Sequence, residues 1–470
     1  MNKGLRLSQE EGAAIWDLMD DAQKSASKYL LKNRKGILDI PTGIGKTLCA
    51  LLRISQTAER KVLILGSKSS LATWRSEFTK WLPHAVEGET FVIVEGSAVK
   101  RKALWEAPVA AHVATYKTWL IDSKALPNLE RSMIKNCDIL ILDECHKTRN
   151  RKTLTYEALK TLGKCVPNLI GLTGTLASRG PQDLWGLLHL CDPKIFSSFW
   201  KFTDTFCRYD ENFMGYKEYV GPKNTEAMAK LVAPYIFKLT DEQLAKLPPS
   251  KRHTLEVTFG KEYRKHYVKL LTDMYLELDS GEIISYSTTL AIATKCRQYL
   301  ACPKVIHESL GYGSGIEAIM DKIESEEDSN ISHCVIYTSF TSVMPHLKEY
   351  IHSRGYKDVF TLVGGTDSVK LKSTIDAWSQ SKGIMLCSLK FAQSFNLGSA
   401  STGFFLAFDW DPNENEQAEG RQKGKRASGF VNYYYVIHSN TLDEGVREVI
   451  NGKTVNVDTM YAHLKNMVRP

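Results

Sequence analysis

The stretch ILDIPTGIGKT, Ile37–Thr47, decides how the chain is interpreted, because it combines an apolar strand, a glycine turn and the start of a helix. Gly43 and Gly45 allow the backbone to curl until successive N–H groups point at phosphate oxygens. Lys46 is placed to bridge β- and γ-phosphates, and the hydroxyl of Thr47 is placed to hold Mg²⁺. The stretch predicts a protein that binds a nucleoside triphosphate by its phosphates, against the alternative of an ordinary glycine turn before a helix.

Length and composition bound the class of protein. A chain of 470 residues is too long for one hydrophobic core, so two or three domains are expected. With 43% hydrophobic and 24% charged residues, the composition is that of a soluble globular protein. The net charge of +8 fits a polyanionic partner, although a basic housekeeping enzyme has the same balance. Charge alone leaves both classes open.

The cysteines and the N-terminal sequence bear on the compartment. Ten cysteines occur without a C-x-x-C pair or a His cluster at metal-ligand spacing, which predicts reduced thiols in a cytosolic protein. The opening MNKGLRLSQEEGAA has no apolar run typical of a signal peptide. No apolar segment approaches the length of about 18 residues that a membrane span needs. We therefore expect a protein that is neither secreted nor bound to a membrane.

Apolar strand-like runs alternate with helical patterns in the first half, which predicts a parallel α/β sheet. From about Pro181 to Leu300 the pattern becomes mainly helical, and Gly311–Gly315 offers a flexible seam before a second α/β series. After the first strand, the expected strands are Val62–Leu65, Phe91–Val94, His112–Ala114, Ile139–Leu142, Leu169–Leu172, Cys334–Tyr337, Val359–Leu362, Ile384–Cys387, Phe404–Phe408 and Tyr433–Ile437.

The fold class that follows is α/β, with two parallel-sheet lobes and helical insertions between them. Three domains are expected. Residues 1–240 form a nucleotide-binding lobe with a helical extension over residues 181–240, residues 241–310 form a helical connector, and residues 311–470 form the second lobe.

Asp143-Glu144-Cys145-His146 follows the apolar strand ILIL, 97 residues after Lys46. A carboxylate at the carboxyl end of a strand faces the ligand crevice of an open α/β sheet. Asp143 is suited to hold Mg²⁺ through water, and Glu144 is suited to orient and deprotonate an attacking water. An Asp-Glu pair after a strand is by itself more often a solvated loop, but its position after the phosphate loop favours the catalytic interpretation.

Two later stretches complete the nucleotide chemistry. A strand ends in LTGT, Leu172–Thr175, whose hydroxyls are placed to pass the state of the γ-phosphate to neighbouring elements. Near the C-terminus QAEGR, Gln417–Arg421, follows the strand FFLAFDW. An arginine offered from the second sheet would stabilise charge on the γ-phosphate during transfer. The nucleotide would then lie between the lobes, and its hydrolysis would open and close the cleft.

The order of these motifs closely resembles a superfamily-two helicase, and within it the Swi/Snf-like branch of DNA translocases. The resemblance covers the chain from about Leu5 to Lys453. The stretches that carry it are LRLSQEEGA (5–13), VLILGSKSSLATWRSEFTKW (62–81), ATYKTW (114–119), DECHKTRN (143–150), LTGTLASRGPQDLWGLLHLCDPKIFSSFWKF (172–202), ATKCRQYLACP (293–303), VIYTSF (335–340), WDPNENEQAEGR (410–421) and TLDE (441–444). Eight or more elements in one order are far more specific than any single match.

The resemblance implies two RecA-like lobes, ATP and Mg²⁺ as cofactors, and DNA as the partner, with protein partners unknown. The implied nucleotide site comprises Gln9, Pro41, Thr42, Gly43, Ile44, Gly45, Lys46, Thr47, Asp143, Gln417 and Arg421. Within it Lys46, Asp143, Glu144 and Arg421 are implied as catalytic, and Thr47 and Asp143 as Mg²⁺ ligands. The implied coupling residues are His146, Thr173 and Thr175.

The nucleic-acid track that the resemblance implies contacts phosphates, since a motor steps over any base sequence. Its implied residues are Lys68, Thr73, Trp74, Arg75, Thr115, Tyr116 and Lys117 in the first lobe, and Thr338, Ser339, Phe340, Ser388 and Lys390 in the second. The alternative for each of them is a solvated loop residue. The ring of Trp74 is expected to serve the core rather than to stack on a base.

Four positions depart from the family pattern. Ile40 replaces the first glycine of the eight-residue phosphate loop, although PTGxGKT is itself the helicase form. The stretch Ser388–Leu397 lacks the paired glycines usual there, and Leu176 replaces the proline usual after TGT. Gly424 stands where a second arginine is usual. The candidates to replace that arginine are Lys423, Lys425 and Arg426, with a slight preference for Arg426. Because the catalytic set is intact, an active ATPase is expected.

The biological role rests on analogy with the family. No bromodomain-like, zinc or long basic appendage occurs, which argues against a dedicated chromatin remodeller. Small stand-alone members, phage-encoded ones included, act at forks and junctions. We therefore expect an ATP-dependent DNA helicase or translocase that remodels or unwinds branched DNA, by branch migration for example, in replication, recombination or repair. Its expected location is the cytoplasm, or the host cytoplasm if a phage encodes it.

Four alternatives stay open at this point. They are a duplex translocase without strand separation, a motor subunit of a larger restriction or defence complex, an RNA helicase, and a binding or scaffold protein with an inactive nucleotide pocket.

Overall fold

The computed structural model of the protein describes residues 5–56, 61–174, 176, 180–211, 217–246, 249–258, 260–273, 275–277, 283–285, 289–325, 333–364, 368–392, 395, 397–423 and 429–450. The chain divides into two compact units, Met1–Lys246 and Leu247–Pro470. Each unit is built around one parallel sheet. The predicted α/β fold class with two parallel-sheet lobes is therefore confirmed.

The first unit alternates strands with helices. Its elements are α1 (Gln9–Leu18), α2 (Asp21–Lys32), β1 (Lys35–Asp39), α3 (Lys46–Gln56), β2 (Val62–Gly66), α4 (Lys68–Trp81), β3 (Phe91–Val94), α5 (Ala98–Glu106), β4 (Ala111–Thr115), α6 (Tyr116–Ala125), α7 (Leu129–Asn136), β5 (Ile139–Asp143), the 3-10 helix η1 (Cys145–Thr148), α8 (Leu154–Cys165), β6 (Asn168–Thr173), α9 (Gln182–Cys191), α10 (Phe199–Phe206), β7 (Cys207–Glu211), β8 (Lys217–Pro222), α11 (Thr225–Val232), β9 (Ile236–Phe237) and α12 (Asp241–Ala245).

The sheet of the first unit has seven parallel strands in the order β3-β4-β2-β5-β6-β1-β9. Strands β2 and β5 are buried along their whole length, as Val/Ile/Leu runs covered on both faces should be. Parallel strands present their carboxyl ends at one edge, so the motifs that follow β1, β2, β4, β5 and β6 gather there. Because β6 lies between β1 and β5, the end of β6 at Leu172 and Thr173 lies between the ends of the strands that lead into the phosphate loop and the acidic box.

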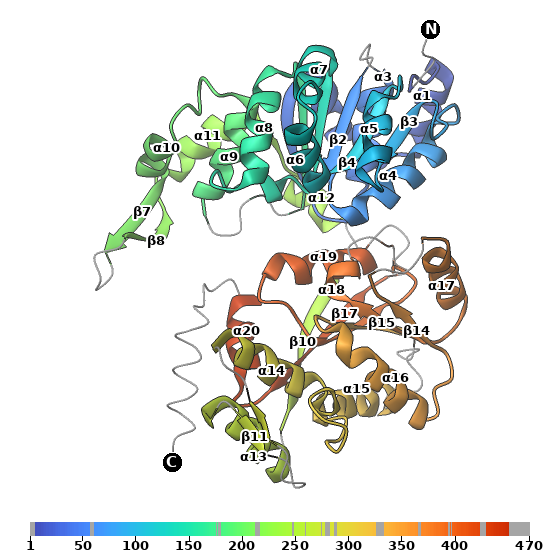
Figure 1. The fold of residues 1–470 in the computed structure, drawn as a ribbon, viewed down its shortest axis with the longest axis vertical. Coiled ribbons are helices and arrows are strands. Elements are labelled where there is room, and N and C mark those ends of the chain that lie inside the picture. The colour runs from blue at the N-terminus through green and yellow to red at the C-terminus, as the bar shows by residue number, and fades with distance from the viewer. Residues whose placement is uncertain are drawn as a thin grey trace. The chain divides into compact units, whose positions relative to one another are not determined.

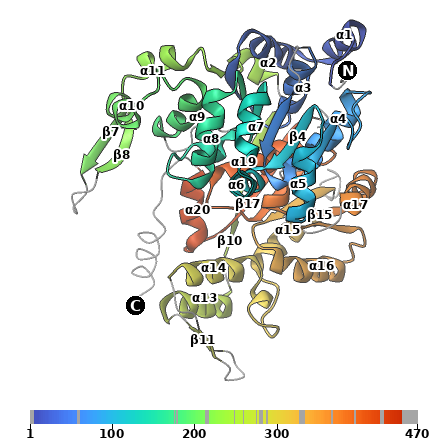
Figure 2. The ribbon, with the colours of Figure 1, turned by 45° about the horizontal axis from the view of Figure 1, so that its top comes forward.

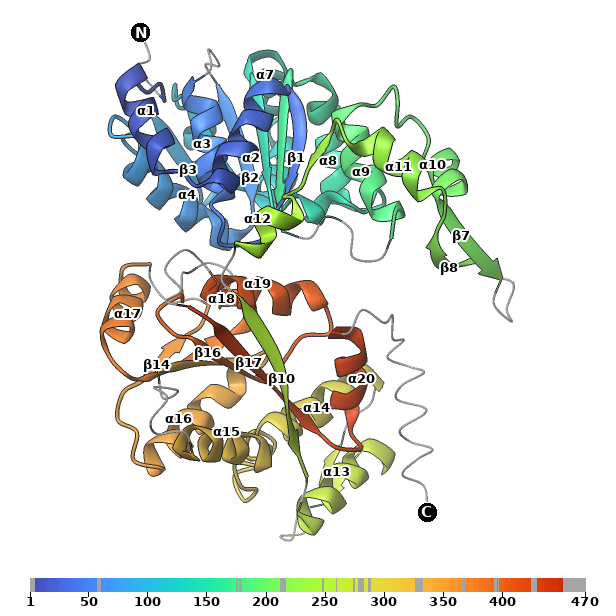
Figure 3. The same cartoon turned by 180° about the vertical axis from the view of Figure 1, so that it is seen from behind.

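Helices cover both faces of this sheet. In Figure 1 α6, α7 and α8 lie in front of the strands, and in Figure 3, from behind, α2 and α3 lie in front. The core on the first face gathers Trp119 of α6, Tyr156 of α8 and Leu188 of α9. The antiparallel β7–β8 hairpin projects away from the sheet beside α10 (Figure 2).

The second unit repeats the alternation. Its elements are β10 (Ser250–Val257), α13 (Lys261–Asp273), β11 (Tyr275–Glu277), β12 (Ile283–Ser285), α14 (Thr289–Ala301), η2 (Pro303–Val305), α15 (Ser314–Ser325), β13 (Cys334–Thr338), η4 (Thr341–Val343), α16 (Met344–Ser353), β14 (Val359–Leu362), α17 (Ser368–Gln380), β15 (Ile384–Ser388), α18 (Leu389–Ala392), β16 (Thr402–Ala407), α19 (Pro412–Gln422), β17 (Val431–His438) and α20 (Leu442–Ile450).

Six parallel strands form the second sheet, in the order β10-β17-β16-β13-β15-β14. One core packs residues of α15 and α16, including Ile319 and Leu347, against one face. The other core packs Trp378 of α17, Leu389 of α18 and Ala418 of α19 against the opposite face. Helix α19, which carries the QAEGR stretch, is therefore seated on the sheet.

Every strand expected from the sequence is present, with its ends within two residues of the predicted ones. The region 241–310 is not a purely helical connector, because β10 within it forms the edge strand of the second sheet beside β17. Likewise the helical extension expected over residues 181–240 contains the β7–β8 hairpin and β9, which joins the first sheet beside β1. Along the chain, the division between the two compact units falls between Lys246 and Leu247.

All ten cysteines are free thiols, and only Cys165 is exposed. Burial is the main reason that the pKa of the Cys137 thiol is raised to about 12. Among the helices that the structure describes, none has the length and apolar character needed to cross a membrane.

Candidate active site and nucleic-acid interface

The phosphate loop joins the carboxyl end of β1 to the first residue of α3. Gly43 and Gly45 have φ of 87° and 92°, in the left-handed region that glycine adopts without strain. The side chain of Lys46 is buried, and its Nζ donates to the carbonyl oxygens of Ile40 at 3.0 Å and Pro41 at 3.3 Å. The backbone of the loop is thus curled, and the Lys46 ammonium lies against its carbonyl oxygens.

Gln23 of α2 supports this loop, and its role was not predicted from the sequence. Its Nε2 donates to the carbonyl oxygen of Ile44 at 2.6 Å. A capping box with Asp20 holds the start of α2, because the Gln23 N–H donates to Asp20 Oδ1 at 2.7 Å. A Cβ at Gly45 would lie 2.5 Å from the Gln23 amide nitrogen and would displace that side chain, and the φ of 92° itself favours glycine there. The capping box is visible in the sequence, but its reach to the loop is not.

The other predicted nucleotide residues of the first unit lie around the same loop. Those within the loop and at the start of α3 are Pro41, Thr42, Ile44 and Thr47. Gln9 is the first residue of α1, and its side chain is exposed. Helix α1 lies beside α3, since a Cβ at Gly12 would be 3.4 Å from Nε2 of Gln56. The adenine-binding role of Gln9 stays a prediction.

Asp143 ends strand β5, with 9% of its surface exposed. Its Oδ2 accepts from Nε1 of Trp74 at 3.0 Å, and its backbone carbonyl accepts from the Tyr116 hydroxyl at 2.9 Å. Its Oδ1 accepts from the N–H of Glu144 at 3.1 Å. The Trp74 indole and the Glu144 N–H orient the two carboxylate oxygens, whereas the Tyr116 hydroxyl holds the backbone at the end of β5. A carboxylate oriented in this way suits an oxygen ligand of Mg²⁺.

Magnesium at this edge would depend on the nucleotide as well as on the protein. Among the described residues, no group of three or more His, Cys, Asp or Glu could hold a metal ion. Mg²⁺ is commonly bound by one or two protein oxygens together with substrate phosphates and waters. The hydroxyl of Thr47 and the carboxylate of Asp143 are donors of that kind, so the residues present fit the ion.

Glu144 has an unusual backbone. Its φ and ψ are both 51°, in the left-handed region. For a non-glycine residue such a conformation costs of order 1 kcal/mol or more, and it persists where the surroundings enforce it. Its Oε2 lies 3.4 Å from Nδ1 of His146, and that nitrogen lies 3.2 Å from Oγ1 of Thr173. The structure brings the predicted general base and two predicted coupling residues together. Thr175 lies outside the described residues.

Gln417 and Arg421 belong to α19 of the second unit. The side chain of Gln417 is buried and that of Arg421 is half-buried. The backbone carbonyl of Arg421 accepts from the N–H of Leu397 at 2.9 Å. Lys423 Nζ lies 3.5 Å from Oε2 of Glu419. The positions considered for a second arginine, Gly424, Lys425 and Arg426, lie outside the described residues. The contact of Arg421 with a γ-phosphate stays a prediction.

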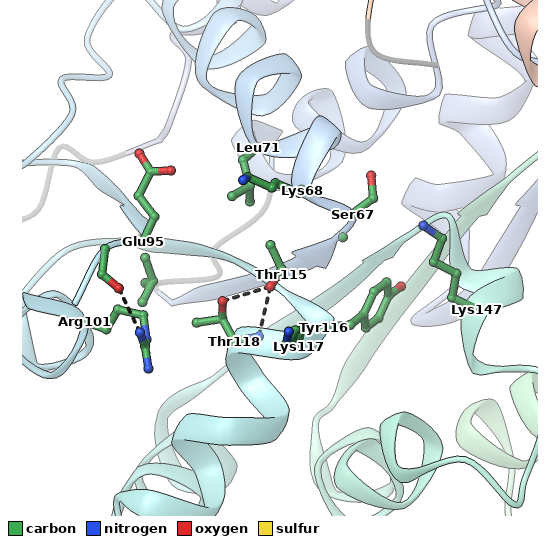
Figure 4. Close-up of a pocket in the computed structure, with 13 residues that line it drawn as sticks. Ser67, Lys68, Leu71, Glu95, Arg101, Thr115, Tyr116, Lys117, Thr118 and Lys147 are labelled. Atoms are coloured by element: carbon green, nitrogen blue, oxygen red, sulfur yellow. Dashed lines mark hydrogen bonds between the residues drawn. The ribbon is translucent and has the colours of Figure 1, made fainter. Parts of the chain in front are cut away.

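A pocket of about 410 Å³ opens at the carboxyl ends of β2, β3 and β4 (Figure 4). It includes the predicted track residues Lys68, Thr115, Tyr116 and Lys117. Two helices begin at its rim. Ser67 caps α4, and Thr115 caps α6 by accepting from the N–H of Thr118 at 2.9 Å. Helix N-termini and lysines favour phosphate groups, so the pocket suits a nucleic-acid backbone.

Arg101 and Lys147 also line this pocket, and neither was singled out from the sequence. Arg101 donates to Asp122 at 2.8 Å and to the carbonyl of Gly96 at 2.8 Å, so part of its donor capacity is used. Lys147 is exposed at the opposite side of the pocket in Figure 4. The signals that could have found them are the basic run of α5 and the basic tail of the acidic box.

Two predicted track residues are corrected by the structure. Trp74 is fully buried and donates to Asp143, so the prediction that its side chain contacts nucleic acid is wrong, and its assignment to the core is confirmed. Arg75 pairs with Glu87 at 2.8 Å and Glu95 at 3.1 Å. The hydrogen bonding that Arg75 donates to the Glu87 carboxylate is the main cause that raises the pKa of Arg75. Its guanidinium is thus occupied by carboxylates rather than turned to a phosphate.

The remaining track residues differ in exposure. Thr73 of α4 is half-buried, and Tyr116 is buried with its hydroxyl on Asp143. In the second unit Thr338 and Ser388 are paired ends of β13 and β15, and both are buried. The other candidates there are Ser339 and Phe340, which are half-buried, and Lys390, which is exposed. Buried Thr338 and Ser388 shape this edge, and Lys390 is the charged group exposed beside it.

A glycine loop between β1 and α3 and an acidic box after β5 define a phosphate-loop nucleotide-binding protein of the α/β class. A family model described as the SNF2-related domain matches residues 10–305. Because the match covers more than half of the chain, this protein belongs to the SNF2-related family.

Individual relatives are distant. The chain is 24% identical to Protein CHROMATIN REMODELING 5 of Arabidopsis thaliana, over 96% of this chain and 27% of that protein. It is 23% identical to the probable ATP-dependent DNA helicase CHR12 of Arabidopsis thaliana, over 88% of this chain and 39% of that protein. It therefore spans well under half of the length of these relatives. A solved SWI2/SNF2 ATPase core of Sulfolobus solfataricus in complex with dsDNA is 19% identical, with a TM-score of 0.44, covering 96% of this chain and 94% of that chain.

Proposed function

We propose that this protein is an ATP hydrolase that acts on DNA and converts hydrolysis into movement along it. One observation carries the proposal. The curled phosphate loop, the strained Glu144 with its His146–Thr173 contacts, and a basic pocket all lie at the carboxyl edge of one sheet. The family supports it, and a relative is described as a probable ATP-dependent DNA helicase.

The residues of the first unit divide the chemistry among them. The N–H groups of the loop at Gly43 and Gly45 would hold the phosphates, and Lys46 would exchange its loop carbonyls for β- and γ-phosphate oxygens. Thr47 and Asp143 would hold Mg²⁺, which supplies neutralisation of phosphate charge. Glu144 would orient the attacking water and accept its proton.

The second unit contributes the arginine. In the proposed reaction Arg421 would stabilise the charge that develops on the γ-phosphate, which a planar guanidinium does well. His146 and Thr173 would report the loss of that phosphate, because they connect Glu144 to the end of β6. This connection is the step that would link hydrolysis to movement.

DNA is the partner that the pocket favours. Lys68, Lys117 and Lys147 surround the N-termini of α4 and α6, an arrangement that attracts phosphates without reading bases. The net charge of +8 adds a long-range attraction to a polyanion. Within this activity we favour a role on forks and junctions in replication, recombination or repair, as the family analogy suggests.

The test is a comparison of ATP turnover with plain duplex, forked DNA, a four-way junction and RNA of the same sequence. We expect stimulation by DNA, largest with branched DNA, and its loss in Lys46→Ala. Lys117→Ala should weaken stimulation without lowering basal turnover, whereas Lys135→Ala, an exposed lysine of α7, should leave both unchanged. Stimulation by RNA alone would replace DNA as the partner, and absence of any turnover would refute the ATPase.

Strand displacement on the same substrates separates unwinding from movement on intact duplex. Release of a labelled strand from a fork would support helicase activity. Displacement of a bound roadblock without strand release would identify a duplex translocase instead.

A further inference from the structure

Asp143 is held by two aromatic side chains that come from two different helices. Trp74 of α4 donates its indole N–H to Oδ2 at 3.0 Å. Tyr116 of α6 donates its hydroxyl to the backbone carbonyl of the same residue at 2.9 Å. Both aromatic side chains are buried. One side chain therefore fixes the carboxylate, and the other fixes the end of the strand that carries it.

Both helices begin at the basic pocket. Ser67 and Lys68 form the start of α4, and Thr115 and Tyr116 form the start of α6. Trp74 follows Lys68 by six residues, which is about 9 Å along a helix. Tyr116 is itself a pocket-lining residue. A phosphate that binds at the rim would contact the first turns of the same rigid elements that hold Asp143.

Helices α4 and α6 connect the basic pocket to Asp143. A shift of α4 or α6 moves a hydrogen-bond donor on Asp143, because neither aromatic ring has room to reorient in a packed core. Groups that orient a metal-binding side chain without touching the metal commonly change metal affinity or activity by 10- to 100-fold when removed. The two donors are therefore placed to transmit occupancy of the pocket to the residue at the nucleotide.

We propose that Trp74 and Tyr116 are positioning residues that couple nucleic-acid binding in the basic pocket to the orientation of Asp143. The inference rests on the proposed function, since it assumes that Asp143 serves a magnesium nucleotide. It assigns to Trp74 a role other than phosphate contact, and to Tyr116 a role in addition to lining the pocket.

The test removes each donor alone. Trp74→Phe deletes the indole N–H, and Tyr116→Phe deletes one hydroxyl. Matched controls lie in the same unit. Trp119→Phe removes an indole N–H that donates to the carbonyl of Ala158 at 3.0 Å, and Tyr156→Phe removes a buried hydroxyl that has no hydrogen-bond partner among the described residues.

Three quantities are measured for each variant. They are the Mg²⁺ concentration for half-maximal binding of a fluorescent ADP analogue, the ratio of DNA-stimulated to basal ATP turnover, and the dissociation constant for duplex DNA without nucleotide. For Trp74→Phe and Tyr116→Phe we expect the Mg²⁺ requirement to rise about 10-fold and the stimulation ratio to fall towards one. DNA affinity should stay within about twofold of the unmodified protein, because no pocket charge is removed.

Several outcomes would overturn the inference. An unchanged Mg²⁺ requirement and an unchanged stimulation ratio in both variants would refute it, as would equal changes in the Trp119→Phe and Tyr156→Phe controls. If Trp74→Phe does not fold, the measurements on Tyr116→Phe decide whether the inference holds, because that substitution removes a single oxygen atom. Failure of the unmodified protein to hydrolyse ATP would refute the proposed function instead. ATP turnover of the unmodified protein is therefore measured before that of any variant.

Discussion

Asp143 in the first unit and Glu419 in the second are both buried carboxylates, with 9% and 1% of their surface exposed. One carboxylate oxygen of Asp143 accepts from the indole of Trp74, and its backbone carbonyl accepts from the hydroxyl of Tyr116. Glu419 is held by Arg252, whose Nε and Nη2 donate to its two oxygens at 2.7 and 2.9 Å. Both carboxylates are buried, but Oδ2 of Asp143 accepts from a neutral indole, whereas Glu419 accepts from a charged guanidinium.

The different partners of Asp143 and Glu419 are explained by the different roles that we propose for the two carboxylates. If Asp143 binds Mg²⁺ as proposed, a neutral donor such as the Trp74 indole orients its carboxylate without adding a positive charge that competes with the ion. A carboxylate that serves only the fold is neutralised, because an unpaired charge in the interior is costly. The pairing also raises the pKa of Arg252, mainly through its hydrogen bond to Glu419. We infer that Glu419 fastens β10 to α19, and the ligand role of the acidic box stays a prediction.

The largest effect is expected from removing charge at the acidic box. Glu144→Gln keeps the shape of the side chain but cannot accept a proton, so ATP turnover should fall roughly 10²- to 10⁴-fold. Affinity for ATP and DNA should be retained. The melting temperature should not fall, because Glu144 gives the fold little beyond its contact with His146. Turnover and thermal unfolding are measured on the same preparation. Turnover close to that of the unmodified protein would remove Glu144 as the general base.

The opposite pattern is expected at the ion pair of the second unit. Arg252→Leu leaves Glu419 buried without its main partner and should lower the free energy of unfolding by about 3 kcal/mol. This is the lower end for a buried pair, because 39% of the Arg252 side chain is exposed. Urea unfolding measures the loss, and hydrogen exchange should place it in β10 and α19.

A double variant sharpens this result. Replacing both partners, Arg252→Leu with Glu419→Leu, should recover most of the stability, since a buried pair is often worth no more than apolar packing. Glu308→Gln removes an exposed carboxylate 3.7 Å from Lys304, which keeps its closer contact with Glu349 at 2.9 Å, and should change nothing measurable. A double variant as unstable as Arg252→Leu alone would mean that packing, not charge, is what the pair supplies.

Local motifs explain the success of the sequence predictions. In ILDIPTGIGKT and in the acidic box, an apolar strand is followed within a few residues by the groups that carry the chemistry. Strand, turn and role could therefore be inferred together. The structure agrees at Gly43 and Gly45, whose φ values match the predicted curl. It also brings His146 and Thr173 within 3.2 Å, while their coupling role stays a prediction.

Contacts between residues far apart in the sequence explain why the other features of the site were not predicted. Gln23 contacts Ile44 across 21 residues, Trp74 contacts Asp143 across 69, and Arg252 contacts Glu419 across 167. No pattern along the chain specifies such pairs, so Trp74 was assigned to the track from its motif position alone. Strand β10 was missed because the edge strand SKRHTLEV is largely exposed and polar, and lacks an apolar run.

The smallest effect is expected for a buried histidine. It extends the comparison from carboxylates to a side chain that can be buried in its neutral form. In the second unit, buried His438 is paired with Asp443, whose Oδ2 lies 2.8 Å from its Nδ1. In the first unit, buried His112 stacks on Trp105 with ring centroids 5.7 Å apart. Burial, with a smaller effect of the Lys61 charge, lowers the pKa of His112 to about 4.

The pH dependence follows from that shift. Between pH 6.5 and about 4 the unfolded chain protonates this histidine while the folded chain does not, so His112 lowers the stability as the pH falls. At pH 5 the loss is about 2 kcal/mol relative to pH 8. His112→Phe keeps a ring against Trp105 and cannot take up a proton, so its free energy of unfolding should fall less steeply over this range. Urea unfolding at pH 8, 6 and 5 measures the difference. Parallel curves for the two proteins would show that His112 is protonated in the folded state and is not simply buried as the neutral form.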